Sequence, residues 1–203
     1  MELETLFGLP AHPLLVHIPV VLVPLAAIIA IVFAFRPAWL DRFGWALVGL
    51  SFVGAIGAIF AAGSGEGLET LQAEPESAAR EDHFELGETA RTIAILFFLI
   101  VAAIVVIRYL ARKRAAKGEQ ATGLWAFLAS KGAAILMAGA LVLSGAAATY
   151  TMAKAGHQGA KLAWEEEVQP GDTGDETNEG GGDEGPADTT TVTDAVTETT
   201  AGG

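Results

Sequence analysis

The chain has 203 residues, 52% of them hydrophobic, which is too apolar for an ordinary soluble domain and short enough for one compact unit. It contains no cysteine, which excludes disulfides, thiolate-held zinc or iron–sulfur clusters, and covalent c-type haem. The formal net charge of −12 belongs to the end of the chain. Residues 165–203 hold 12 of the 24 acidic residues and no Lys or Arg, which leaves 1–164 neutral.

Four apolar stretches are long enough to cross a membrane, which takes about 20 residues of helix. They span about 14–35, 43–62, 92–110 and 132–151. The helical pattern of the third continues from near Pro75 to near Ala116, so we expect this helix to project beyond the bilayer. The first stretch lacks a basic segment before it and a cleavage site after it, which favours a retained span over a signal peptide. The sequence thus predicts an all-α fold, an integral membrane four-helix bundle in 1–164.

Basic residues in the short loops predict the orientation of the bundle, because such loops stay in the cytoplasm. Eight of the twelve Lys and Arg lie in the loops after the first and third stretches, between 36 and 42 and between 108 and 131. The loop between the second and third stretches is acidic instead. We therefore expect both termini to lie outside the cytoplasm, with the lipid bilayer as partner.

Small residues spaced four apart allow two membrane helices to approach closely. This spacing occurs in the second and fourth stretches, as Gly54-x-x-x-Ala58, Gly57-x-x-x-Ala61 and Ala140-x-x-x-Ser144-x-x-x-Ala148. We expect these residues to form seams within the bundle, in preference to a dimer interface. In the first stretch, Pro19 and Pro24 each remove a backbone donor and favour a kink.

The same non-cytoplasmic end of the predicted bundle holds the complete set of histidines, His12, His17, His83 and His157. With Pro13 as the first helical residue, His12 is expected to cap the first helix, and His17 lies inside it. Five residues correspond to about 140° of rotation on an ideal helix, so these two rings do not form a ready-made chelate. His83 lies at the entry of the third helix, and His157 follows the fourth.

One hypothesis is that imidazoles from different helices hold a haem b or a divalent metal. His17 is the first candidate, because an ionisable residue inside a span is costly and usually faces the bundle interior. His83 is its partner from another helix, with His12 and His157 at the entrance. Glu66, Glu69 or Glu85 would complete a metal shell. The alternative is that these histidines are interfacial and bond to carbonyls or water, which is favoured for His12 and His157 individually.

Two further polar residues lie at this end. Arg91 is expected to snorkel or to pair with Glu88, and anion binding is the less favoured role. Tyr150 and His157 are seven residues apart and share a face if the helix persists beyond its apolar span, so Tyr150 either bonds to a cofactor or ligand or anchors the helix in the interface.

The opening run His12-Pro13-Leu14-Leu15-Val16-His17-Ile18-Pro19 and the closing run Gly156-His157-Gln158-Gly159-Ala160-Lys161-Leu162-Ala163-Trp164 carry a family resemblance. They resemble the HPLLVHFP and GHxGGxLVY signatures of small four-helix bacterial membrane proteins, catalogued as a domain of unknown function. The departures are mild: Ile18 for Phe, Ala160 for Gly, Ala163 for Val and Trp164 for Tyr. The resemblance covers about 8–170 and implies a four-helix protein of the bacterial inner membrane. Related domains joined to Rieske-type or cytochrome c domains imply electron transfer by analogy.

Residues 165–203 are rich in Gly, Thr, Asp and Glu and are predicted to form a disordered acidic tail. The function predicted first is a membrane-embedded protein with a His-based haem b or metal site at the non-cytoplasmic face. The family resemblance implies that it is a subunit of an electron-transfer system, with a redox membrane or periplasmic partner. The alternative is a non-catalytic scaffold or accessory subunit without a cofactor. No nucleophile–base arrangement, P-loop or dinucleotide motif occurs, so the sequence disfavours an enzyme acting on its own, and nothing in it suggests nucleic-acid binding.

Overall fold

The computed structural model describes residues 5–6, 9–71 and 78–168, which belong to one compact unit, Met1–Gln169. Pro75 and the acidic residues after 168 lie outside the described residues, so the disordered tail stays a prediction. The last helix continues to Val168, four residues beyond the expected end of the membrane domain.

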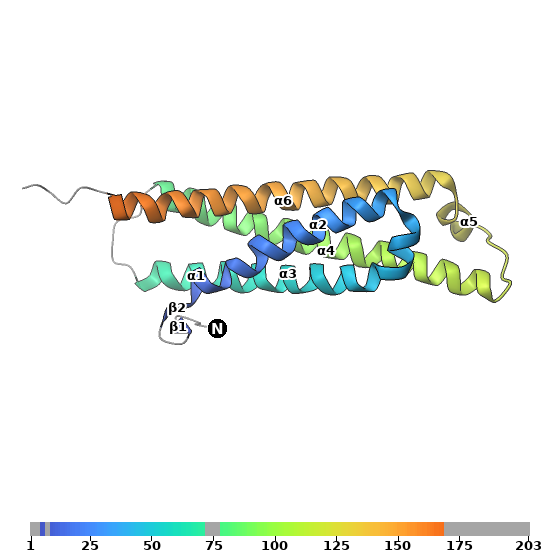
Figure 1. Ribbon diagram of the computed structural model, residues 1–203, viewed down its shortest axis with the longest axis horizontal. Coiled ribbons are helices and arrows are strands. Elements are labelled where there is room, and N and C mark those ends of the chain that lie inside the picture. The colour runs from blue at the N-terminus through green and yellow to red at the C-terminus, as the bar shows by residue number, and fades with distance from the viewer. Residues whose placement is uncertain (1–4, 7–8, 72–77, 169–203) are drawn as a thin grey trace, which may run out of the picture. The chain divides into compact units, whose positions relative to one another are not determined.

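In the described part of the chain, two short strands precede six helices (Figure 1). The order is β1 (Thr5–Leu6), β2 (Leu9–Pro10), α1 (Ala11–Leu15), α2 (His17–Phe35), α3 (Pro37–Leu71), α4 (Ala78–Ala116), α5 (Leu124–Leu128) and α6 (Lys131–Val168). The strands pair antiparallel, with Thr5 opposite Pro10. Everything that follows in the described chain is helix or a short connection.

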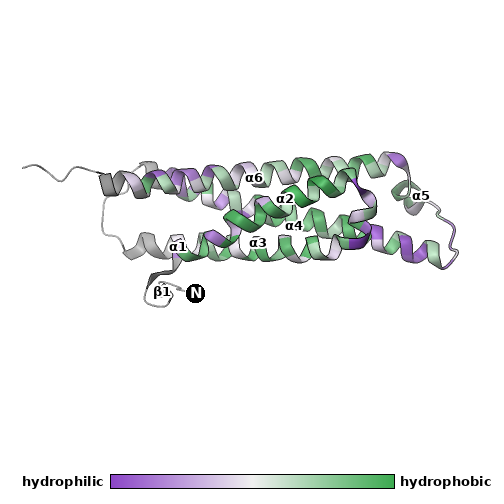
Figure 2. Ribbon diagram, viewed as in Figure 1, coloured by the Kyte–Doolittle hydropathy of each residue, from purple (hydrophilic) through white to green (hydrophobic). Residues whose placement is uncertain are grey.

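Four stretches of helix are long and apolar enough to cross a membrane: His12–Phe35, Pro37–Gly65, Glu81–Ala116 and Lys131–Leu162. The predicted all-α fold with four spans is therefore confirmed. The helices are longer than their apolar centres, and α4, at 39 residues, measures about 58 Å against about 30 Å of hydrocarbon. Helix α4, which contains the third apolar stretch, ends at Ala116, as predicted. Polar residues gather at the helix ends and apolar residues between them (Figure 2).

The four long helices form a closed bundle. Helix α2 packs against both α3 and α6, and α4 packs against the same two helices from the other side. In Figure 1, α2 crosses the bundle from α3 at the α1 end toward α6 at the other. The core contains Val23, Ala26, Ala27 and Ala30 of α2, Leu47 of α3, Phe97 and Val101 of α4, and Leu141 and Ala148 of α6. Its many alanines allow the close backbone approach on which helix association in lipid depends.

The small-residue spacing of α3 forms a seam within the bundle, as predicted. A Cβ at Gly57 would lie 2.6 Å from Cγ2 of Ile18 on α2, and one at Gly54 would lie 3.0 Å from Cγ2 of Val23. On α6, Gly145 makes the closest approach to α2, since its Cβ would lie 3.3 Å from that of Ala27. In the expected run on α6, Ala148 is buried in the core and Ala140 packs against it, so this run also faces the bundle interior.

The first helix differs from expectation at its start. It begins at Ala11, so His12 lies in the first turn and does not cap the helix from outside. Pro13 tolerates this position, because first-turn N–H groups have no helical partners in any case. The helix is interrupted at Val16, between α1 and α2. Pro19 contributes to the interruption, because its missing N–H leaves the carbonyl of Leu15 without a helical partner.

Candidate functional site

The histidines of α1 and α4 meet at the end of the bundle where α1 packs against α3. We call this place the His12–His83 site; it also includes Ser64, Gly65, Phe84 and Gly159. Its residues come from four helices, because the rings of His12 and Phe84 both lie against Gly65 of α3, and His83 precedes Phe84 in α4 and contacts Gly159 of α6.

His12 is held by the backbone of α3. Its ring atom Nδ1 lies 3.0 Å from the carbonyl oxygen of Ala61 and 3.1 Å from Oγ of Ser64. A carbonyl only accepts, so Nδ1 carries the proton and the neutral ring has its lone pair on Nε2. Buried Ser64 donates to the same carbonyl at 2.8 Å, which fixes this acceptor in place. This arrangement, a ring N–H bonded to a carbonyl, is how ligating histidines are commonly oriented.

A glycine allows the ring of His12 to lie against α3. A Cβ at Gly65 would lie 3.2 Å from Cε1 of His12 and 3.5 Å from Cε1 of Phe84. Both rings therefore lie against the bare backbone at this point. Any larger residue would push α1 or the Phe84 ring away from α3.

His83 is half-buried, and its Nδ1 is a buried atom without a hydrogen-bond partner among the described residues. Leaving such a group unpaired costs about 1–3 kcal/mol. A buried polar atom left in this state requires an explanation, such as a water or an ion that completes it. The ring also contacts α6, where a Cβ at Gly159 would lie only 2.8 Å from Cε1 of His83. A glycine thus lies close to each of the two imidazoles, Gly65 beside His12 and Gly159 beside His83.

His17 does not face the bundle interior as expected. It is exposed, and its Nδ1 donates to the carbonyl of Pro13 one turn earlier in the same chain segment. The reason is rotational: His12 turns inward to α3, and a ring five residues later points about 140° away. The structure therefore brings His12 and His83 together and leaves His17 on the outer surface.

Three other residues expected at this site, His157, Tyr150 and Glu85, have exposed side chains. His157 is exposed on α6, two residues before Gly159, and Tyr150 is 67% exposed farther along that helix. Glu85 is exposed on α4. The side chains of Glu66 and Glu69 lie outside the described residues. Among the side chains that are described, no three His, Asp or Glu residues gather closely enough to hold a metal ion.

Arg91 makes the predicted ion pair, with Nη2 3.2 Å from Oε1 of Glu88 one turn earlier. The pair is part of the polar surface of α4, and both side chains are partly exposed. A pair of this kind contributes little to stability.

No role was predicted from the sequence for the residues that support the two rings. Ser64 and Gly65 lie in the run Gly63-Ser64-Gly65, where two glycines flank a hydroxyl within an apolar helix. That pattern was a usable signal, because a buried serine in a span needs a partner. Gly159 was visible only as part of the closing motif, and its role emerges from the contact between α4 and α6.

Comparison with known proteins finds one family. The family described as Predicted membrane protein (DUF2231) matches residues 8–171, which confirms the resemblance that the two motifs indicated. No curated protein and no solved structure matches the chain.

Proposed function

The chain belongs to the DUF2231 family of predicted membrane proteins, and we propose that it is a membrane subunit that holds a haem b between His12 and His83. The observation that carries the proposal is the state of the two rings. His12 has Nδ1 bonded to a carbonyl and a lone pair on Nε2, and His83 has a buried Nδ1 without a partner among the described residues. The loop charges favour a position at the non-cytoplasmic face.

The number of donors favours haem over a bare ion. Structural zinc sites use four protein ligands and catalytic sites use three, whereas the described side chains offer two imidazoles together and no group of three donors. Haem iron receives four ligands from its porphyrin, so one or two protein side chains suffice. The alternative is a divalent metal held by the two imidazoles, with water in its other coordination positions, and these two donors favour it less than haem.

The protein side chains would bind and orient such a group. The carbonyl of Ala61, held by Ser64, fixes the ring of His12 and increases the basicity of Nε2. The backbone lies close to His12 at Gly65 and close to His83 at Gly159, because neither glycine has a side chain that would contact the ring. A bound haem supplies one-electron transfer, which suits a subunit with a redox partner in the membrane or the periplasm. We do not propose that the chain catalyses a reaction on its own.

A second function is favoured by one specific observation. The bonds of His12 to Ala61 and Ser64 tie α1 to α3, and a purely structural clasp needs no lone pair on Nε2. In that case the chain is a non-catalytic scaffold or accessory subunit. The two functions differ in cofactor content, which makes them separable in one experiment.

The test is an absorption spectrum and a metal analysis of the detergent-purified chain, supplied with haem during expression. We expect a Soret band at about one haem per chain, lost in His12→Ala and in His83→Ala. His17→Ala is the matched control, because that ring is exposed and bonds to Pro13 one turn earlier in the chain, and it should retain the band. A stoichiometric metal without a Soret band supports the divalent-ion variant. Neither haem nor metal in the unaltered chain contradicts the proposal and favours the scaffold.

A further inference from the structure

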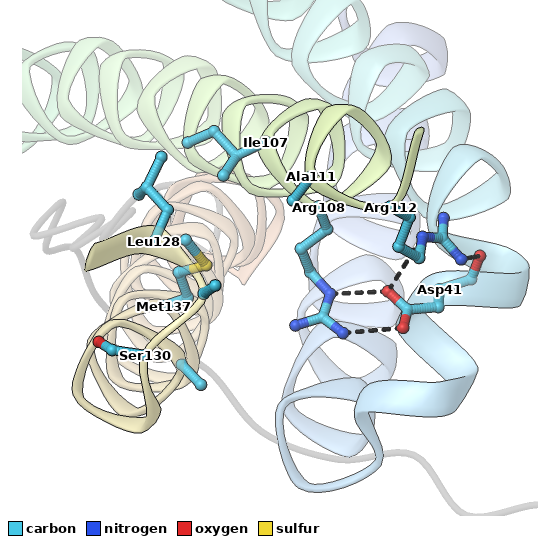
Figure 3. A pocket seen from close by; sticks show the side chains of 10 residues that line it. Asp41, Ile107, Arg108, Ala111, Arg112, Leu128, Ser130 and Met137 are labelled. Carbon is cyan, nitrogen blue, oxygen red and sulfur yellow. Dashed lines mark hydrogen bonds and ion pairs between the residues drawn. The ribbon is translucent and has the colours of Figure 1, made fainter. Parts of the chain in front are cut away.

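A polar pocket lies at the opposite end of the bundle, where α3, α4, α5 and α6 meet (Figure 3). Its volume is about 160 Å³. The lining residues are Asp41, Ile107, Arg108, Ala111, Arg112, Leu128, Ala129, Ser130, Ala134 and Met137. The pocket thus combines charged side chains from α3 and α4 with apolar side chains from α4, α5 and α6.

The charges of this pocket sum to a positive value, since two guanidinium groups face one carboxylate. Arg108 binds Asp41 with two bonds, from Nε to Oδ1 at 2.7 Å and from Nη2 to Oδ2 at 2.9 Å. Arg112 donates to the backbone carbonyl of Asp41 at 2.9 Å. The third guanidinium nitrogen of Arg108 points away from Asp41, toward the side where Ser130 and Met137 lie (Figure 3). One positive charge therefore remains to attract an anion into the pocket.

The surroundings of the pocket are those of a membrane interface. Helix α5 has no buried side chain, and its Leu124 and Phe127 are 67% and 54% exposed. In α5, the ring centre of Trp125 lies 4.9 Å from the guanidinium of Arg114, which also pairs with Glu119. Cationic groups above exposed apolar side chains match the headgroup and the acyl chains of an anionic lipid.

We propose that this pocket binds the phosphate of an anionic phospholipid. The phosphate lies against Arg108 and Arg112, where planar guanidinium groups suit its oxygens. The acyl chains run along the apolar side of the pocket at Ile107, Leu128 and Met137 and over α5. A free phosphate has no apolar part that could contact these apolar walls, so the combination of charge and apolar surface points to a lipid. The site is independent of the histidines at the other end.

The test is native mass spectrometry of the detergent-purified chain, titrated with phosphatidylglycerol, with phosphatidylcholine or with inorganic phosphate. We expect phosphatidylglycerol to bind in preference to the other two. Arg112→Gln should weaken its binding about tenfold, because a charged contact inside the pocket is lost. Lys113→Gln is the matched control, with the same loss of charge outside the pocket, and its effect should stay below about fivefold.

A second variant leaves the charges untouched. Ala111→Phe fills the pocket from α4 and should abolish the preference for phosphatidylglycerol even if Arg112→Gln does not fold. Equal binding of the two lipids by the unaltered chain overturns the proposal. So does a preference that survives Ala111→Phe, or a loss in Lys113→Gln as large as in Arg112→Gln. Inorganic phosphate that binds as tightly as phosphatidylglycerol also overturns it and assigns the pocket to free anions.

Discussion

At the scale of single residues, the contrast between His12 and His17 shows how far spacing can be interpreted. Their separation of five residues predicts that the two rings point to different sides of the helix, and they do so. Which ring points inward is decided by the carbonyl of Ala61 and the hydroxyl of Ser64 on another helix. Because these contacts come from another helix, the spacing could not reveal them. His17 was therefore expected in the bundle interior, whereas the structure turns His12 inward.

Gly159 should be intolerant of even one additional methyl group. Gly159→Ala places a Cβ 2.8 Å from Cε1 of His83, and overpacking of this kind costs about 1–3 kcal/mol. We expect a lower unfolding temperature in detergent together with reduced haem content. Gly156→Ala is the matched control on the same helix, because its Cβ would lie 3.9 Å from Val20. Equal unfolding temperatures and haem contents for the two variants would show that His83 is not fixed against α6.

At the scale of helices, the apolar centres could be predicted and the polar extensions only in part. The sequence places the end of α4 at Ala116 because the helical pattern persists through its charged residues. Helix α6 was expected to end near 151, yet it extends to Val168. Its outer turns are polar, so hydropathy does not predict that they are helical. In the structure they contact α4, where Gly159 lies against His83. The small-residue spacing identified α3 as a packing helix, but not α2 as its partner.

The contact between α2 and α3 can be tested at Gly57. Gly57→Ala brings a Cβ to 2.6 Å from Cγ2 of Ile18, so the helices must separate, at a cost of about 1–3 kcal/mol. Thermal unfolding in detergent should show this loss, and adding Ile18→Ala should restore part of it, because the clashing methyl group is gone. Gly63→Ala on the same helix has open space around its Cβ and should be neutral or slightly stabilising. Purely additive effects in the Gly57 and Ile18 pair would argue against the seam.

At the scale of the whole molecule, four spans follow directly from four apolar stretches. The orientation of the bundle stays a prediction from loop charge. The chain has no cysteine, so single-cysteine variants give an unambiguous readout. Ala160→Cys lies on the exposed outer part of α6 and Ala121→Cys in the loop before α5, and both positions are exposed. A membrane-impermeant maleimide applied to intact cells should label the first and spare the second. The opposite pattern would place the His12–His83 site in the cytoplasm.

The most direct test of the central proposal is the electron paramagnetic resonance spectrum of the ferric, haem-loaded chain. Iron held by two histidines would be low-spin, so the unaltered chain and His17→Ala should both give a low-spin signal. Removing one imidazole in His83→Ala should convert any haem that is retained to a high-spin form. A high-spin signal in the unaltered chain, or a low-spin signal that persists in His83→Ala, would contradict a haem held between His12 and His83.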